Sequence, residues 1–261
     1  MKQLRPSCLS ALPSIRRAIW APAAGAITAL VLMLPTIAYG QDTTPATVDA
    51  TTPLCRLGVN AASDPIEKFD IAQLRTGFYI DYSADASPVH PNGAEYMPII
   101  GLEQIQRGKD DYAYHPNGAA LDAAIAANLG ATWIIGNEPD RRYYQNDMEP
   151  AAYARAYHDL YRLLKSKDPN ATVLAGAIVQ PTPLRLQYLD LVLRAYVAKY
   201  REPMPVDGWA IHNFILNERS CEYYLDPAHR PPDYDGPEPY NGAYVCWGRT
   251  FPPASAPQMD W

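Results

Sequence analysis

The chain has 261 residues, which is enough for one sizeable domain with a buried core. Hydrophobic residues make up 48% and charged residues 19%, and this composition excludes a disordered tail. Four of the 22 basic residues and none of the 28 acidic ones lie in residues 1–40, so the remainder carries a net charge of −10. An acidic chain without a basic run excludes nucleic acid as the expected partner and fits a neutral substrate.

Residues 1–40 have the pattern of an export signal. A basic start is followed by an uncharged apolar run over 18–37, and Ala38-Tyr39-Gly40 provides a small-x-small cleavage pattern. We predict a signal peptide over 1–40 and a secreted or extracytoplasmic protein. The alternative is an uncleaved membrane anchor with the domain outside, because the apolar run is about long enough to cross a bilayer. The basic residues are Lys2, Arg5, Arg16 and Arg17.

Residues 41–53 are rich in Thr, Ala and Pro, which predicts a flexible linker before a domain over 54–261. Outside the cytosol cysteines are expected to pair. Cys221 and Cys246 bracket a loop rich in Pro and Tyr, so we expect a disulfide between them, with Cys55 left over. The cysteine spacings lack the close pairs of zinc sites, and no nucleotide-binding Gly-rich loop is present, so we expect no metal and no cofactor.

Strands and helices alternate in the predicted order, which favours an α/β fold with a parallel sheet. The sheet could be an open doubly wound sheet or most of an eight-stranded barrel. After Asn217 the pattern dissolves into loop. In chain order the predictions are a strand over 56–60, a helix over 64–74, strands over 77–82 and 95–101, a helix over 119–129, a strand over 132–136, a helix over 150–167, a strand over 172–178, a helix from 182 to about 200, and a strand over 206–214.

The most informative segment runs from Trp133 to Asp140, where a short apolar run ends in Asn137-Glu138-Pro139. In a barrel of parallel strands, the carboxyl ends of the strands carry the catalytic groups. A glycosidic bond is cleaved by protonating its leaving oxygen, and Glu138 is the leading candidate for that proton donor. The competing interpretation is a solvated glutamate at a helix start, where the helix dipole favours it.

The sequence resembles the large clan of retaining TIM-barrel glycoside hydrolases whose fourth strand ends in Asn-Glu. It is most similar to endo-β-1,3-glucanase-like catalytic domains. The matching segments are Gly136-Asn137-Glu138-Pro139-Asp140, Gln145-Asn146-Asp147-Met148 with Pro150 and Ala151, Phe78-Tyr79-Ile80-Asp81-Tyr82, Tyr96-Met97-Pro98-Ile99-Ile100 and Asp207-Gly208-Trp209-Ala210-Ile211-His212.

This resemblance implies a (β/α)8 TIM barrel, here apparently truncated after strand six, with Glu138 as the catalytic acid/base. Asn137 would hold a sugar hydroxyl and help to orient the nucleophile, and His212 would bind substrate or tune a carboxylate. By the two-residue period of a strand, His212 shares a face with Gly208 and Ala210. Its alternative is a core histidine bonded to the backbone. Substrate binding is also expected of Asp81 and Tyr82, whose alternatives are a strand-end turn and a packed ring.

One part of the family pattern is missing from the sequence. A retaining mechanism needs a second carboxylate, which in this clan ends strand seven. Glu218, Glu222 and Glu238 lie in the Pro- and Tyr-rich loop without a leading apolar run, so no nucleophile is assigned. The sequence therefore predicts a secreted glycoside hydrolase-like domain that acts on a β-linked polysaccharide or oligosaccharide. The alternatives are a non-catalytic carbohydrate-binding protein on the same scaffold and an unrelated exported α/β protein.

Overall fold

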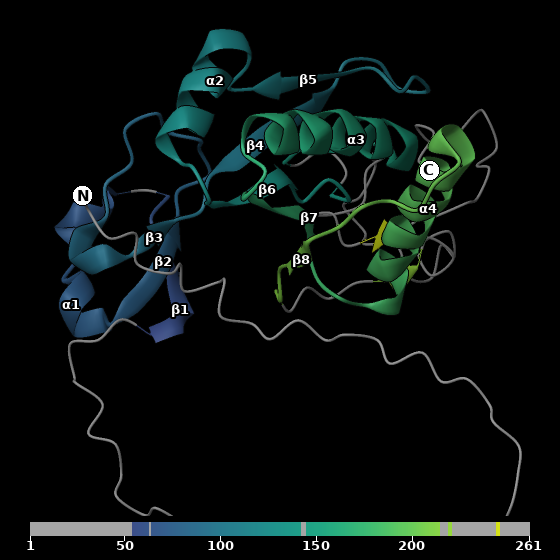
Figure 1. The fold of residues 1–261 in the computed structure, drawn as a ribbon. Helices are drawn as coiled ribbons and strands as arrows, with labels where there is room; N and C mark the ends of the chain where they lie inside the picture. The colour runs from purple at the N-terminus through teal and green to yellow at the C-terminus, as the bar shows by residue number, and fades with distance from the viewer. Residues whose placement is uncertain (1–53, 63, 142–144, 215–218, 221–243, 246–261) are drawn as a thin grey trace, which may run out of the picture.

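The structure is a computed structural model that describes residues 54–62, 64–141, 145–214, 219–220 and 244–245. The predicted signal peptide and linker, and both Cys221 and Cys246, lie outside these residues. Strands and helices alternate along most of the described chain (Figure 1). Its elements are β1 (Leu54–Asn60), η1 (Ile66–Lys68), α1 (Ile71–Leu74), β2 (Thr76–Ile80), η2 (Pro91–Gly93), β3 (Glu95–Tyr96), β4 (Ile99–Gln104), β5 (Tyr112–His115), α2 (Gly118–Ala127), β6 (Thr132–Asn137), α3 (Pro150–Lys167), β7 (Thr172–Ile178), α4 (Pro183–Tyr200), β8 (Gly208–Ile211), β9 (Arg219–Ser220) and β10 (Tyr244–Val245).

The strands that begin the fold pair in parallel and in chain order. One sheet has the order β1-β2-β3, and the other continues with β4-β6-β7-β8, all parallel except for the hairpin strand β5 on β4. Met97 and Pro98 join the two sheets, because Met97 N–H donates to Tyr79 O (3.0 Å) and Ile134 N–H donates to Pro98 O (2.9 Å). A doubly wound sheet reverses its strand order, and no such reversal occurs among the described strands. The order agrees with that of consecutive barrel strands.

The two faces of the sheet have different coverings. On β6, Trp133 and Ile135 face the main core, which they share with α2, α3 and α4. Ile134 faces the opposite side and packs in a smaller cluster with residues of β4, β7 and β8. Figure 1 shows α3 lying across β6 and β7. Since both faces of β6 are covered, its six residues are all buried, and this strand is a rigid support for the residues that follow it.

The helix α3 follows the sequence closely because its signals agree. Pro150 occupies the first turn, and Lys165 and Lys167 occupy the last. The apolar residues that repeat at helical spacing form one face that is buried or half-buried, namely Tyr153, Tyr157, Leu160, Tyr161 and Leu164. Its buried members are Tyr153, Tyr157, Leu160 and Leu164.

Several predicted boundaries are wrong. The helix predicted over 64–74 is two short pieces, η1 and α1, because Asp70 accepts a hydrogen bond from Gln73 N–H (2.9 Å) and starts a new helix. The strand predicted over 95–101 is interrupted at Pro98, which has no N–H for the ladder. The hairpin strand β5 and the short parallel pair β9–β10 were not predicted.

The prediction that Cys55 is left over is also wrong, because Cys55 is disulfide-bonded. Cys55 lies at the start of β1, the outer strand of its sheet, and it is exposed there. Among the described strands β1 pairs with β2 alone, so a disulfide at this point restrains a strand at the edge of its sheet.

Candidate active site

Glu138 lies immediately after β6, at the carboxyl end of the strand. It is only 2% exposed, and its backbone N–H donates to Ala177 O of β7 (2.9 Å). Its φ of 46° lies in the left-handed region, which costs a non-glycine residue about 1–2 kcal/mol. A buried carboxyl group held in an unfavourable backbone conformation is typical of functional sites.

The bend that delivers Glu138 depends on two glycines. Gly136 has a φ of 82°, which only glycine adopts without strain. On β7, a Cβ at Gly176 would lie 2.5 Å from Ile135 O and 2.7 Å from the Tyr153 hydroxyl, so no larger residue fits. Tyr153 reaches from α3 into this place, where its hydroxyl donates to Ile135 O (3.0 Å) and accepts from Gly176 N–H. The strand-end geometry is therefore fixed from three elements.

Both oxygens of the Glu138 carboxylate have partners. His212 Nδ1 donates to Oε1 (3.0 Å), and Arg141 Nη1 donates to Oε2 (3.0 Å). Burial raises the pKa of Glu138, but the hydrogen bonds from His212 and Arg141 and the charge of Arg141 outweigh it and leave this pKa below its usual value. The site as described therefore favours the carboxylate form.

His212 comes to Glu138 from the end of β8, where its backbone N–H donates to Ile178 O (2.9 Å). Ala210, two residues earlier, packs on the inner face of the sheet, so the face expected from the sequence is the face observed. The His212 ring also makes an edge contact with Phe214, with centroids 5.4 Å apart. Its imidazole is thus held beside the carboxylate rather than bonded to backbone in the core.

Asn137 is buried and does not contact the Glu138 side chain in any described hydrogen bond. Its Nδ2 donates to Gln145 Oε1 (3.0 Å), and its backbone N–H donates to Asn146 Oδ1. Met148 N–H donates to Pro139 O (2.8 Å). The segment 145–148, which is part of the resemblance noted in the sequence, therefore folds back and supports the end of β6.

Asp81 and Tyr82 lie at the end of β2. Asp81 Oδ1 accepts from Ser83 N–H (3.0 Å), Ser83 Oγ (2.8 Å) and Tyr96 Oη (2.8 Å), so Asp81 forms a strand-end turn. The Tyr82 ring packs on the inner face, and its hydroxyl accepts from Asn60 Nδ2 (2.7 Å). Neither residue has a described contact with Glu138.

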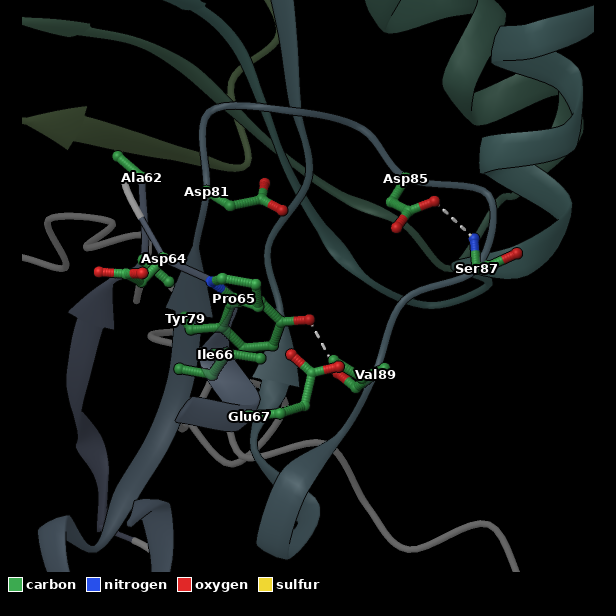
Figure 2. Close-up of a pocket in the computed structure, with 11 residues that line it drawn as sticks. Ala62, Asp64, Pro65, Ile66, Glu67, Tyr79, Asp81, Asp85, Ser87 and Val89 are labelled. Carbon is green, nitrogen blue, oxygen red and sulfur yellow. Dashed lines mark hydrogen bonds between the residues drawn. The ribbon is translucent and has the colours of Figure 1, made fainter. Parts of the chain in front are cut away.

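A cavity of about 460 Å³ lies between the loops that follow β1 and β2, and Asp81 lines it (Figure 2). Four carboxylates surround it, and the Tyr79 hydroxyl donates to Val89 O (2.8 Å) at its wall. Burial, and then the charge of Asp81, raise the pKa of Tyr79 to about 12. The cavity is lined by Ala61, Ala62, Asp64, Pro65, Ile66, Glu67, Tyr79, Asp81, Asp85, Ser87 and Val89.

Sequence reasoning missed Arg141, Tyr153 and the buried ion pair of Asp140 with Arg185. The position of Arg141 three residues after Glu138 was a readable signal, since an acid and a base at this spacing can pair across a turn. The contacts of Tyr153 and of Asp140 join distant elements, so no local pattern reveals them.

No group of His, Cys, Asp and Glu able to hold a metal occurs among the described residues. Within the same residues, no helix has the length and apolar character needed to span a membrane.

Comparison with known proteins gives weak likenesses only. The sequence matches no family model and no curated protein. A GH128 (subgroup II) endo-β-1,3-glucanase from Sorangium cellulosum is similar over 52% of this chain and 52% of its own, with 17% identity and a TM-score of 0.36. AbfB, a family 51 α-L-arabinofuranosidase from Bifidobacterium longum, is similar over 48% of this chain and 26% of its own, with 20% identity and a TM-score of 0.31.

Both of these structures are glycoside hydrolases. The chain spans about half the length of the first and about a quarter of the second. Scores this low carry no argument about fold or function, so the functional case rests on the site itself.

Proposed function

We propose that the chain is a glycosidase-like domain that acts on a β-linked polysaccharide or oligosaccharide, with Glu138 as the group that transfers the proton to and from the glycosidic oxygen. The observation that carries this proposal is the buried Glu138 carboxyl at the carboxyl end of β6, gripped by His212 from β8 and by Arg141. Parallel α/β sheets place their reacting groups at this edge. An export signal would bring such a domain to extracellular carbohydrate.

Each contact of the Glu138 carboxyl group has a role in this mechanism. A proton-transferring carboxyl group must be held at a fixed position and partly shielded from water. His212 and Arg141 fix the two oxygens, and burial supplies the shielding. A retaining mechanism adds a second carboxylate at about 5–5.5 Å. Asp140 does not offer one, because its carboxylate is directed at Val179 N–H and Arg185.

Reducing-sugar release from a panel of β-glucans by the full chain and by Glu138→Gln tests the assignment. We expect the variant to lose at least 100-fold in kcat, the range that general acid–base catalysis contributes. Glu149→Gln is a matched control, because Glu149 is a half-buried carboxylate that accepts from Gln104 Nε2 (2.7 Å) at the start of α3. Equal rates for the wild type and Glu138→Gln would remove Glu138 from the mechanism.

A second assay separates an acid/base from a nucleophile. In a retaining mechanism a second carboxylate, not identified among the described residues, would form the glycosyl-enzyme by displacing the leaving group. The dinitrophenolate of a dinitrophenyl glycoside leaves without protonation, so Glu138→Ala should still form this glycosyl-enzyme but hydrolyse it slowly. Azide should then restore turnover and give a glycosyl azide of retained anomeric configuration. An azide product of inverted configuration would make Glu138 the nucleophile instead.

A non-catalytic carbohydrate-binding domain is the second candidate. It is favoured by two observations: both Glu138 oxygens accept hydrogen bonds from the protein, and the pKa of Glu138 lies below its usual value. Such a group binds hydroxyls as an anion but does not readily supply a proton. Calorimetric titration with oligosaccharides that are bound and recovered uncut would support this candidate. Glu138→Gln would then weaken binding without any change in product.

A further inference from the structure

Asp140 and Arg185 form an ion pair that is almost fully buried, with side chains 0% and 2% exposed. Arg185 Nη1 donates to the backbone O of Asp140 (2.5 Å) and to its Oδ2 (3.3 Å). On the other side, Val179 N–H donates to Asp140 Oδ1 (3.2 Å). Asp140 thus connects the turn after β6 to the end of β7 and to α4.

The location of Arg185 is unfavourable for a cation. It is the third residue of α4, after the Thr182 cap and Pro183, and the helix dipole disfavours positive charge in a first turn. Burying an ion pair is also expensive, and an apolar pair of similar volume is often at least as stable. A buried pair placed against the local preference indicates a role other than stability.

The pair holds the turn that carries Glu138. Arg141 N–H donates to Glu138 O (3.1 Å), so residues 138–141 form one turn, and Glu138 N–H is bonded to Ala177 O. Asp140 lies inside this turn, and both its backbone O and its carboxylate accept hydrogen bonds from Arg185 of α4. Apart from this anchor, the turn is held by the Met148 N–H bond to Pro139 O and by the contacts of Glu138 itself. We expect these contacts to be too few to keep Glu138 left-handed once Asp140 is released, so its carboxyl would swing away from His212.

We propose that Asp140 and Arg185 are a positioning pair that locks the Glu138 carboxyl against His212 and Arg141. The catalytic meaning of the lock rests on the proposed function, but the lock itself is a property of the unliganded chain.

The pKa of the Glu138 carboxyl, followed by carbon NMR titration without substrate, tests the lock. In the wild type the contacts with His212 and Arg141 keep this pKa below its ordinary value. Asp140→Ala removes the anchor, so we expect the Glu138 pKa to rise by about one unit or more as burial alone acts on it. Arg185→Lys keeps the charge but replaces the guanidinium, whose Nη1 bonds the backbone O and the Oδ2 of Asp140, by an ammonium of different reach, and should shift the pKa in the same direction.

The sign of the change in the Glu138 pKa separates a positioning role of Asp140 from a purely electrostatic one. Deleting the Asp140 charge without releasing the turn would remove a nearby anion and lower the Glu138 pKa. Asp140→Asn is that case, because an amide oxygen can still accept from Val179 N–H and the Arg185 bond to the backbone O remains. We therefore expect no rise in Asp140→Asn. A fall of the Glu138 pKa in Asp140→Ala, or no change in Arg185→Lys, would overturn the proposal.

Asp168→Asn controls for a general loss of stability. Asp168 is 3% exposed and accepts from Gly130 N–H (2.6 Å) and Asn170 N–H (3.1 Å) ahead of β7, at the opposite end of the strands. It should be destabilising without moving the Glu138 pKa, and an equal shift in this variant would refute the lock. If Asp140→Ala does not fold, Arg185→Lys and Asp140→Asn decide the question by their opposite expectations.

The values of kcat and KM then test whether the positioning pair affects catalysis. If the chain hydrolyses glycosides, Asp140→Ala should lower kcat at least 10-fold with little change in KM, because the group that it displaces acts in the transition state. If Glu138→Gln retains full activity while the NMR shifts appear, the proposed function fails and the positioning pair stands.

Discussion

Replacing Tyr153 by phenylalanine removes one hydroxyl that joins β6 to β7 directly beneath Glu138. The hydroxyl donates to Ile135 O (3.0 Å) and accepts from Gly176 N–H, and Tyr153 is fully buried. The variant takes the Tyr153 partner away from a buried backbone C=O and a buried backbone N–H. Each buried group that loses its partner costs about 1–3 kcal/mol, so for the two groups the free energy of unfolding should fall by about 2–6 kcal/mol.

Urea unfolding followed by circular dichroism measures this loss, and α3 supplies the control. Tyr157 lies one turn along the same helix and is equally buried, but its hydroxyl has no hydrogen-bond partner among the described residues. Tyr157→Phe removes the same atom without orphaning a backbone group, so it should be neutral or stabilising by up to about 1 kcal/mol. Equal losses in the two variants, or a loss below about 0.5 kcal/mol in Tyr153→Phe, would refute the reasoning.

Two further predictions concern the same strand ends. Because the pKa of Glu138 is lowered on folding, its carboxylate contributes stability that is present above pH ~4.5 and is lost as the pH falls through the folded-state value. Glu138→Gln should therefore flatten the acid limb of stability against pH, and an unchanged limb would contradict the pKa direction. Gly176→Ala should destabilise the fold by about 1–3 kcal/mol or more, since its Cβ meets Ile135 O at 2.5 Å; a neutral effect on the urea midpoint would show that the strands are not packed as described.

The sequence predicted those elements whose local and tertiary preferences agree. The range of α3 is the predicted one, because the Pro150 start and the Tyr and Leu periodicity coincide with burial against β6 and β7. The range of β7 is also the predicted one, as a short apolar run that is buried on both faces. The two-residue alternation of side chains along a strand likewise predicted that His212 shares a face with Ala210, and on that face it contacts Glu138.

The misses arise where a single side chain or a distant partner decides the structure. Asp70 caps a new helix within an otherwise helical pattern, and the sequence does not show that its carboxylate turns back to Gln73. The pairing of Asp140 with Arg185 joins residues 45 positions apart, and no periodicity links them. Asp81 forms a turn through Ser83 and Tyr96 and lines the cavity between the loops after β1 and β2, which the sequence did not indicate, and its substrate binding stays a prediction.

The protonation of Glu138 connects the two candidate functions. Burial is the largest influence on its pKa and acts upward, whereas His212 and Arg141 act downward and prevail in the unliganded site. A saccharide that covers the site would exclude water and strengthen the upward influence, and a nearby second carboxylate would add to it. An acid catalyst should therefore show a higher alkaline limb in the pH profile of kcat than in that of kcat/KM, because the first reports the complex and the second the free protein. In a purely binding domain the anion persists, so oligosaccharide affinity should stay constant from neutral pH down to about pH 5. A titration that shows proton uptake on binding would therefore favour the enzyme over the binding domain.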